Sequence, residues 1–585
     1  MDWKRLDRTR RSASPLELDL IDHYAEGNIG RRDFLKRGAI LGLGVPFMAT
    51  VIAACGEDPA STATTGGATA TTAGGAPATT AAPAQGGTLN AAIQQGDATS
   101  GLDPLNMLDL GTYSVLTQSF EYLVGLAPDG NIGNNGLASE WSTNADATVW
   151  TFKLREGVMW HDGTPFTSAD VAATLDRMAE VNAGVGGVWV AGAVETPDDF
   201  TAVVNLERAN GNLPVLISIY NPQSLVTPVD YASGTTLDAR PNGTGAFIFD
   251  THDATSAITT FKANDNYWGG RPNLDEVVLT GFASEGARVS AMQAREIDMV
   301  QSFSVIDGAS LLDDPNFTVL TPPSLNHRQL WFNTQLPVGG PFTDARVRQA
   351  FGFMLDRQQM VDTLFDGFGS IGNDHPVHPT LPFFDADATP QRTVDIPMAK
   401  QLLADAGYEG LRATIYTGDI TYSADMGAIV EQNALEAGVT LQVSTQANSD
   451  FYADQWCAGA SYGTRPDTGG PGLPCGASSE IGIVDYGHRP TPDVYFGRAL
   501  QTDGDWNSSN YASAEFDGLF ADYQSSIDVA GQKAAVGAIQ KLLHKDAPAL
   551  YPFFFDYLAG HDNSVSGVQV TALGHMQFQN ASKAS

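Results

Sequence analysis

Residues 149–167 read VWTFKLREGVMWHDGTPFT, and the interpretation of the fold starts from this stretch. In its first part Trp150, Phe152 and Leu154 alternate with other residues, which is typical of a strand with one buried face. The HDGT segment at 161–164 is typical of a tight turn. The stretch therefore predicts a half-buried strand that ends in a turn.

A helix is predicted directly after this turn. Thr167 and Asp170 have the spacing of a capping box, and the helix that they open should run through Met178. Because a strand is followed by a helix, the stretch favours a mixed α/β fold over a helical bundle or a β-sandwich.

Two further helices are predicted in the second half of the chain. One runs from near Thr343 to just before Gly367, with apolar residues at Val347, Phe351, Leu355 and Met360. The other has Pro397 in its first turn and Gly407 just past its end, as helices commonly do. Strands alternate with helices and no internal repeat is evident, so at 585 residues we expect two or three α/β lobes.

The composition excludes some partners. The formal net charge is -35, whereas binding to nucleic acid or to anionic lipid needs a basic surface. Apolar residues make up 43% of the chain, which is enough to bury a large core. We therefore expect a globular protein that does not bind nucleic acid.

The first 54 residues are typical of an export signal. Arg31 and Arg32 precede an uncharged run at 38–54, which resembles a twin-arginine (Tat) signal. The run ends in IAAC, which resembles a lipobox, so Cys55 is the predicted lipidation site and the mature N-terminus. An uncleaved N-terminal anchor is the alternative, and both interpretations place the body outside the cytoplasm.

A low-complexity segment follows the lipobox. Residues 55–86, the predicted lipidated cysteine and its tether, contain almost only Ala, Thr, Gly, Ser and Pro after Cys55. Such a composition cannot form a core and predicts a flexible tether or an O-glycosylated stalk.

Two cysteines remain, Cys457 and Cys475. An even number in an exported chain favours one disulfide, which would close the Gly- and Pro-rich loop at 458–474. This loop contains no histidine, so a zinc site is not expected there.

The sequence shows no convincing catalytic or metal motif. The GFGSIG letters at 367–372 match a dinucleotide fingerprint, but they follow a predicted helix rather than a strand, so we interpret Gly367 as a helix end. His375 and His378 are separated by prolines and are interpreted as surface loop residues. We therefore predict no catalytic residue, no metal and no cofactor.

The body of the chain, from about residue 87 to 570, resembles the family 5 solute-binding proteins of ABC importers, which include peptide and nickel binders. The resemblance rests on the stretch at 150–167 and on further segments that occur in the order of the family. These segments are LDPLN at 102–106, FEYLV at 120–124, LASEW at 137–141, NGTG at 242–245, NYWGG at 266–270, QAREID at 293–298 and PFTDARVRQA at 341–350.

The resemblance implies a two-lobe periplasmic-binding-protein-like α/β fold with a ligand cleft between the lobes. Lobe one would comprise residues 87–322, with an extra subdomain at about 126–245, and the return of the chain at 551–585. Lobe two would comprise residues 323–550. Closure of the lobes about a hinge would capture the solute and present it to the permease.

The segment DYGHRPTPDVYF at 485–496 corresponds to the stretch that lines the cleft in this family. Oligopeptide binders carry there an Asp that pairs with the amino terminus of the peptide, whereas this chain carries His488 or Arg489. An arginine favours a carboxylate or phosphate on the ligand. The alternatives are that Asp493 holds an amine, or that Arg489 forms only a local salt bridge.

Aromatic residues near the expected cleft are candidate stacking surfaces. They are Tyr113, Trp456, Tyr462 and Tyr486, and core packing is the alternative role for each.

The resemblance implies a monomeric, lipid-anchored component of an ABC importer, outside the cytoplasmic membrane, that takes up a short peptide or a peptide-like solute. An opine, an oligosaccharide or a metal chelate is the alternative solute. A different class of function, an exported hydrolase or a chemoreceptor partner, is the second alternative.

Overall fold

The computed structural model describes residues 85–96, 102–105, 109–127, 131–181, 188–231, 242–322, 324–335, 337–456 and 479–584, and all of them belong to one compact unit, residues 82–585. Among these residues, helices long and apolar enough to cross a membrane are absent. Cys55, Cys457, Tyr462 and Cys475 lie outside the described residues, so their predicted roles remain predictions.

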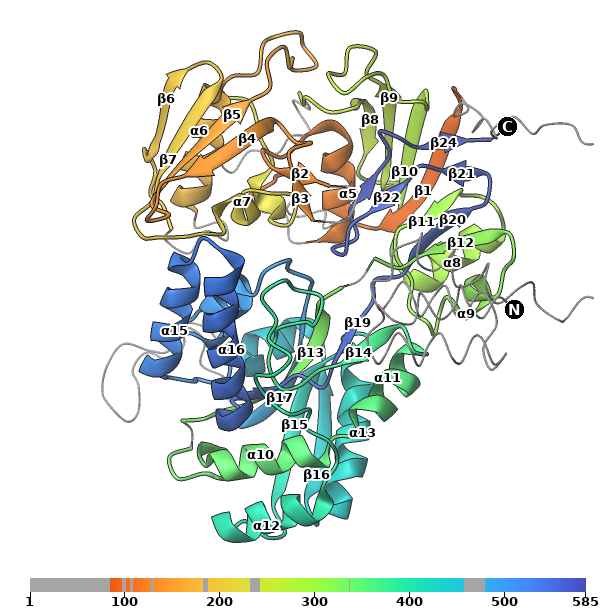
Figure 1. The fold of residues 1–585 in the computed structure, drawn as a ribbon. Helices are drawn as coiled ribbons and strands as arrows, with labels where there is room; N and C mark the ends of the chain where they lie inside the picture. The colour runs from red at the N-terminus through yellow and green to blue at the C-terminus, as the bar shows by residue number, and fades with distance from the viewer. Residues whose placement is uncertain are drawn as a thin grey trace, which may run out of the picture. The chain divides into compact units, whose positions relative to one another are not determined.

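The first of two large sheets, which we call the sheet of lobe one, has the strand order β12-β20-β11-β1-β10-β9-β8 (Figure 1). Its strands are β1 (Thr88–Gln94), β8 (Phe247–Asp253), β9 (Ile258–Ala263), β10 (Glu276–Phe282), β11 (Met299–Val300), β12 (Phe317–Leu320) and β20 (Ala559–Asp562). The central strand β1 pairs in parallel with β10 and β11, and its residues Leu89, Ala91, Ala92 and Ile93 are buried. The helices of this lobe are α5 (Leu110–Ser119), α8 (Glu285–Gln293) and α9 (Ala309–Leu312).

A smaller antiparallel sheet, β4-β5-β7-β6, lies inside the lobe-one sequence. Its strands are β4 (Ala138–Thr143), β5 (Val149–Leu154), β6 (Val194–Asp198) and β7 (Thr201–Asn205), and they accompany the short pair β2 (Gly125–Leu126) and β3 (Ile132–Gly133), with helices α6 (Ser168–Glu180) and α7 (Leu213–Leu216). The predicted strand is confirmed as β5, with Trp150, Phe152 and Leu154 buried. The predicted helix is confirmed as α6, whose capping box joins Thr167 and Asp170.

The second large sheet, which we call the sheet of lobe two, has the order β14-β19-β13-β17-β15-β16, and β18 also pairs with β13. Its strands are β13 (Asn326–Phe332), β14 (Gly369–Ile371), β15 (Arg412–Gly418), β16 (Thr440–Gln446), β17 (Ile481–Tyr486), β18 (Ala549–Leu550) and β19 (Phe553–Phe555). The helices of lobe two are α10 (Ala345–Met354), α11 (Arg357–Phe365), α12 (Ile396–Ala406), α13 (Ser423–Glu436), α14 (Asn448–Phe451), α15 (Ala514–Ser525) and α16 (Val529–Asp546). Helix α12 confirms the predicted Pro at its first turn and Gly407 at its end.

The predicted single helix from Thr343 to Gly367 is wrong. The chain forms α10 and α11 instead, separated by Leu355 and Asp356. Asp356 accepts a hydrogen bond from the backbone N–H of Gln359 at 2.9 Å and so begins a new helix. The apolar spacing continues across the break because both helices pack on the same core, and the spacing alone did not reveal the break.

The chain crosses between the two large sheets twice, once between β12 and β13 and once between β19 and β20. Strand β19 pairs with β13 and β14, so the return to lobe one begins after Phe555 rather than at the expected residue 551. Four short strands then complete lobe one, namely β21 (Val565–Ser566), β22 (Gln569–Val570), β23 (Met576–Gln577) and β24 (Ser582–Lys583). The last of these brings Lys583 to an ion pair with Asp298 at 2.7 Å.

Candidate functional site

The carboxyl ends of the parallel strands in both large sheets carry the segments that join the lobes. In lobe one, β12 ends where β20 begins, with Leu320 paired to Ala559, at the same edge as the ends of β1, β10 and β11. In lobe two, β17 ends beside the start of β13, with Tyr486 paired to His327. Ligands of open α/β sheets bind outside the carboxyl ends of the strands, so the candidate site lies here.

A cavity of about 160 Å³ adjoins the crossing at residues 556–558 and is lined from both lobes. Phe303 and Leu558 come from lobe one, and Phe365 and Phe555 come from lobe two. These side chains give the cavity apolar walls, as small-molecule sites commonly have.

Charged groups stand at the edge of this cavity. The buried Arg328 donates a hydrogen bond from Nη2 to the carbonyl of Thr421 at 2.8 Å, and its guanidinium lies 5.0 Å from the ring of Phe555. Burial raises the pKa of Asp556, which also lines the cavity, to about 6. The cavity therefore offers a cation and a weak acid beside apolar walls, which suits an amphipathic organic solute.

The loop that follows β17 is fixed to the first crossing segment by His488. Its backbone N–H donates to Oδ1 of Asn326 at 2.8 Å, and its Nδ1 accepts from the backbone N–H of Leu325 at 3.0 Å. On the other side, the ring of His488 lies 5.2 Å from the ring of Tyr220 in lobe one. His488 thus contacts both lobes and the segment between them.

His488 and His575 are neutral donors in this region. Burial, together with the charge of Arg489, lowers the pKa of each to about 3. Because Nδ1 of His488 accepts a hydrogen bond, its proton resides on Nε2, which has no partner among the described residues. Neither ring nitrogen of the fully buried His575 has one among them either.

Arg489 is partly buried between these groups. Its Nη1 donates to the carbonyl of His488 at 2.7 Å. Burial raises the pKa of Tyr113 to about 12, and the charge of Arg489 opposes that rise. The Tyr113 ring packs edge-on against His575, with 5.3 Å between the centroids. The structure therefore brings Tyr113, His488 and Arg489 together around a group of hydrogen-bond donors.

Two of the predicted aromatic residues pack within lobe two. Tyr486 is buried against His327 and Tyr495, with ring centroids 5.4 and 5.9 Å apart. Trp456 packs edge-on against Tyr452 at 5.4 Å. Both belong to or pack against a lobe-two core cluster, which fits the packing role that was the alternative in the sequence.

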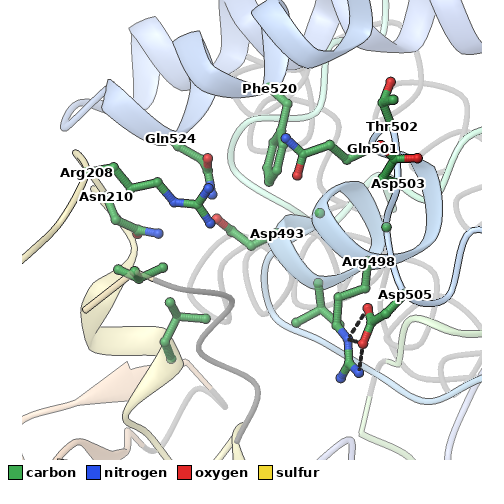
Figure 2. Close-up of a pocket in the computed structure, with 15 residues that line it drawn as sticks. Arg208, Asn210, Asp493, Arg498, Gln501, Thr502, Asp503, Asp505, Phe520 and Gln524 are labelled. Atoms are coloured by element: carbon green, nitrogen blue, oxygen red, sulfur yellow. Dashed lines mark hydrogen bonds and ion pairs between the residues drawn. The ribbon is translucent and has the colours of Figure 1, made fainter. Parts of the chain in front are cut away.

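Asp493 lies at a second cavity between the lobes, of about 320 Å³ (Figure 2). The figure shows Arg208 and Asn210 of lobe one reaching toward Asp493 and Gln524 of lobe two. Oδ2 of Asp493 accepts hydrogen bonds from the side chains of Asn212 and Tyr523, both at 3.0 Å. Burial raises the pKa of Asp493, and these donors oppose the rise. Asp493 is therefore near Arg489 in sequence, but it lines a cavity of which Arg489 is not a wall.

The interpretation of His375 and His378 as surface residues is wrong. Both are buried, and burial lowers the pKa of each to about 4. Nε2 of His375 lies 3.2 Å from the side-chain amide of Gln540, and Nδ1 of His378 lies 2.7 Å from the hydroxyl of Thr380. The prolines that exclude a helix do not prevent burial, because helix α16 supplies one of the covering side chains.

Sequence reasoning missed Tyr220, Arg328 and His575. They lie far from their partners in sequence: Tyr220 packs against His488, His575 packs against Tyr113, and Arg328 bonds to Thr421. In the part of the chain that the structure describes, no group of three or more His, Cys, Asp or Glu residues is placed to hold a metal ion.

Comparison with known proteins agrees with this architecture. Residues 134–463 match the family described as "Bacterial extracellular solute-binding proteins, family 5 Middle". The chain is similar to heme-binding protein A of Haemophilus influenzae, with 25% identity over 77% of this chain and 84% of that protein. It is also similar to the dipeptide-binding protein of Escherichia coli, with 24% identity over 76% of this chain and 85% of that protein.

A solved structure has the same fold. The periplasmic binding protein DppA of Helicobacter pylori, in complex with the peptide STSA, superposes with a TM-score of 0.69 at 20% identity. The superposition covers 86% of this chain and 99% of that one.

Proposed function

The chain belongs to the bacterial extracellular solute-binding proteins of family 5, and we propose that it is the solute-binding component of an ABC importer for a short peptide or a peptide-like solute. The match over residues 134–463 carries the proposal. Two similar proteins support a peptide as the solute: one is a dipeptide-binding protein, and the other was solved in complex with the peptide STSA. Binding is reversible and involves no covalent chemistry.

Two cavities lined from both lobes support a mechanism by hinge closure. Residues 321–322, 324–325 and 556–558 lie between the strands of the two lobes and act as the hinge, so that rotation about them opens and closes the cleft. Closure around a solute excludes water and forms the surface that the permease subunits recognise. The mature protein acts as a monomer, with Cys55 as its lipid anchor and residues 55–86 as its tether.

Arg489 is the proposed anchor for a carboxylate of the solute. Its guanidinium and the Nε2–H of His488 are donors, and a carboxylate is the acceptor that such donors favour. Asp493 is the second candidate anchor, for an amine, because its buried Oδ1 has no hydrogen-bond partner among the described residues. A peptide carries both groups, so its two ends can be tested separately.

The experiment begins with native mass spectrometry of the mature protein and thermal-shift screening of peptides, sugars and chelates. A peptide that binds is then compared with its C-amidated and N-acetylated forms by calorimetry. Arg489→Gln should weaken the free-carboxylate peptide about tenfold or more and leave the amidated form unchanged. Asp493→Asn is the matched variant for the amine, measured with the acetylated peptide.

The affinity of Arg489→Gln and the thermal-shift screen test different parts of the proposal. Equal affinities of Arg489→Gln and the unaltered protein for the free-carboxylate peptide would exclude the carboxylate anchor. A thermal shift with a sugar but with no peptide would exclude peptide uptake. A thermal shift with a metal chelate would favour a metal chelate as the solute. The heme-binding relative and the neutral rings of His488 and His575 support this alternative.

A further inference from the structure

Asn212 of lobe one reaches into a buried polar pocket of lobe two. Its Nδ2 donates to Oδ2 of Asp493 at 3.0 Å and to the hydroxyl of Tyr523 at 2.9 Å. Its Oδ1 accepts from Nε2 of Gln532 at 3.1 Å. Asn212 is 8% exposed, and all three partners belong to lobe two. Both polar atoms of one side chain are therefore used across the boundary between the lobes.

The partners of Asn212 are themselves held in place. Tyr523 donates its hydroxyl proton to the same Oδ2 of Asp493 at 3.0 Å. Tyr523 lies on α15, Gln532 lies on α16, and Asp493 lies just before the π-helical turn at Tyr495–Leu500. Three separate elements of lobe two thus form the binding site for the side-chain amide of Asn212.

The backbone beside Asn212 fits lobe two equally closely. The N–H of Gly211 donates to the carbonyl of Gln524 at 2.8 Å. A Cβ at Gly211 would lie 2.4 Å from the carbonyl oxygen of Ser526, so any other residue there would force the two lobes apart. The contact is a matched fit of a lobe-one turn to the helices of lobe two.

We propose that Asn212 is the latch that holds the two lobes together, and that it sets the fraction of closed protein before any solute binds. All the donors and acceptors are neutral except Asp493, and water can replace each of them when the lobes separate. The latch therefore opens without leaving an unpaired charge in a core. Because the apparent affinity for a solute scales with the populated fraction of the competent form, Asn212 acts as a positioning residue for binding without contacting the solute.

This inference deepens the proposed function but is tested without a solute. The mature protein and Asn212→Ala are compared by hydrogen exchange with mass spectrometry and by small-angle X-ray scattering. Loss of the latch should raise exchange at residues 211–217 and in the facing part of α15 about tenfold or more. It should also increase the radius of gyration.

Asn264→Ala is the matched control. Asn264 is 7% exposed, and its hydrogen bonds to Gly245 and Asn266 both lie within lobe one. This variant should leave exchange at residues 211–217 and the radius of gyration unchanged. If Asn212→Ala does not fold, Tyr523→Phe removes one partner of the latch from the lobe-two side and retains the ring.

The outcomes separate the two proposals. Unchanged exchange and scattering in both Asn212→Ala and Tyr523→Phe, or an equal change in Asn264→Ala, would overturn the latch. Faster exchange together with no binding of any solute would leave the latch standing and count against the proposed function.

Discussion

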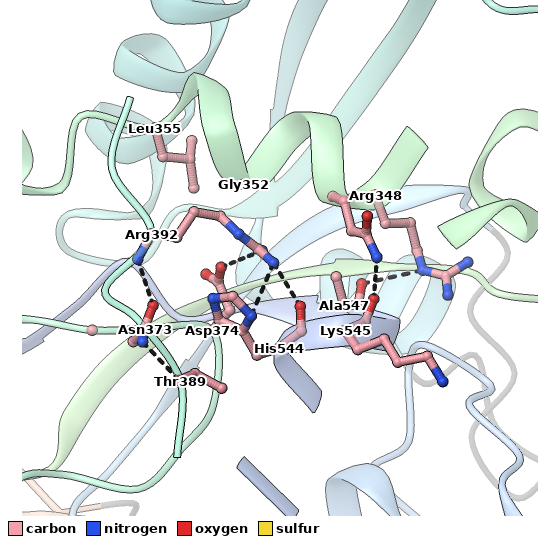
Figure 3. A network of polar contacts seen from close by, with 12 residues as sticks. Arg348, Gly352, Leu355, Asn373, Asp374, Thr389, Arg392, His544, Lys545 and Ala547 are labelled. Atoms are coloured by element: carbon pink, nitrogen blue, oxygen red, sulfur yellow. Dashed lines mark hydrogen bonds and ion pairs between the residues drawn. The ribbon is translucent and has the colours of Figure 1, made fainter. Parts of the chain in front are cut away.

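Two buried carboxylates in this protein have opposite kinds of partners. Asp374 lies inside lobe two and is bound by Arg357 at 2.7 and 2.9 Å. Arg392 also binds it, at 2.6 Å (Figure 3). Asp493 lies at the boundary between the lobes and is bound by the amide of Asn212 and the hydroxyl of Tyr523. The hydrogen-bond donors to Asp374 are therefore charged, whereas Asn212 and Tyr523, which donate to Asp493, are neutral.

The pKa values follow the same division. Burial alone would raise the pKa of Asp374, but the two guanidinium groups lower it below its usual value. Burial raises the pKa of Asp493, and its neutral donors do not reverse the rise.

The arginine cluster is also completed within its own lobe. Arg392 donates from Nη2 to the carbonyl of His544 at 2.6 Å, and Arg348 donates from Nη2 to the carbonyl of Asp546 at 2.6 Å, both at the end of α16. Carbonyls at the end of a helix have no partner within that helix, so these arginines satisfy them. The cluster thus ties α10, α16 and the segment around Asp374 into one rigid lobe.

The largest expected effect comes from breaking the permanent cluster. Asp374→Asn leaves two buried guanidinium groups without a counter-charge, so the free energy of unfolding should fall by about 3–5 kcal/mol. Denaturant unfolding at neutral pH measures this change. In the control Asp250→Asn, which removes an exposed pair with Lys262, the loss should stay below about 1 kcal/mol. Similar losses in the two variants would contradict the comparison.

A third carboxylate, Glu121, tests whether neutral partners leave a buried acid weak. Glu121 accepts hydrogen bonds from Tyr267 at 2.8 Å and from Thr244 at 2.8 Å, and burial raises its pKa from 4.5 to about 7. The folded state therefore holds this proton more tightly than the unfolded state. This contribution to stability is complete below about pH 4.5 and is lost as the pH rises through 7.

Glu121→Gln should remove this part of the pH dependence. The lost contribution amounts to about 3 kcal/mol between pH 4 and 8, at 1.36 kcal/mol for each unit of pKa shift. Unfolding curves of the variant and of the exposed control Glu207→Gln measure it over that range. A variant whose stability falls with pH as steeply as that of the control would show that Glu121 is not the titrating group.

The smallest effect is expected at the rim of the cavity in Figure 2. Arg498 pairs there with Asp505, and its guanidinium lies 3.5 Å from the centroid of the Trp506 ring. The side chains of the pair are 34% and 50% exposed, so Arg498→Gln should lower the free energy of unfolding by less than about 1 kcal/mol. A loss of stability as large as that of Asp374→Asn would mean that exposed and buried ion pairs contribute equally to the stability of this protein.

Local structure was predictable from the sequence where local interactions decide it. The strand at 149–154, the helix cap at Thr167 and the end of α12 at Gly407 all depend on neighbouring residues. The break at Asp356 has the same kind of local signal, because an Asp directly before the first helical residue is a good N-cap, but the continuous apolar spacing concealed it.

The candidate site was only partly predictable. The loop with His488 and Arg489 was found through its resemblance to a family segment, but its surroundings come from Tyr113, Tyr220 and His575. Asn212 meets Asp493 across 281 positions of sequence, and nothing in the local pattern around either residue indicates the other. Such pairs are set by the packing of one lobe on the other.

Strand β20 has a consequence for how the protein is made. It lies between β11 and β12 in the sheet of lobe one, yet a ribosome produces it long after both of these neighbours. Until residues 559–562 emerge, both neighbours present unpaired backbone groups, which attract other chains and proteases. A chain that lacks residues 559–562 therefore cannot close the sheet of lobe one.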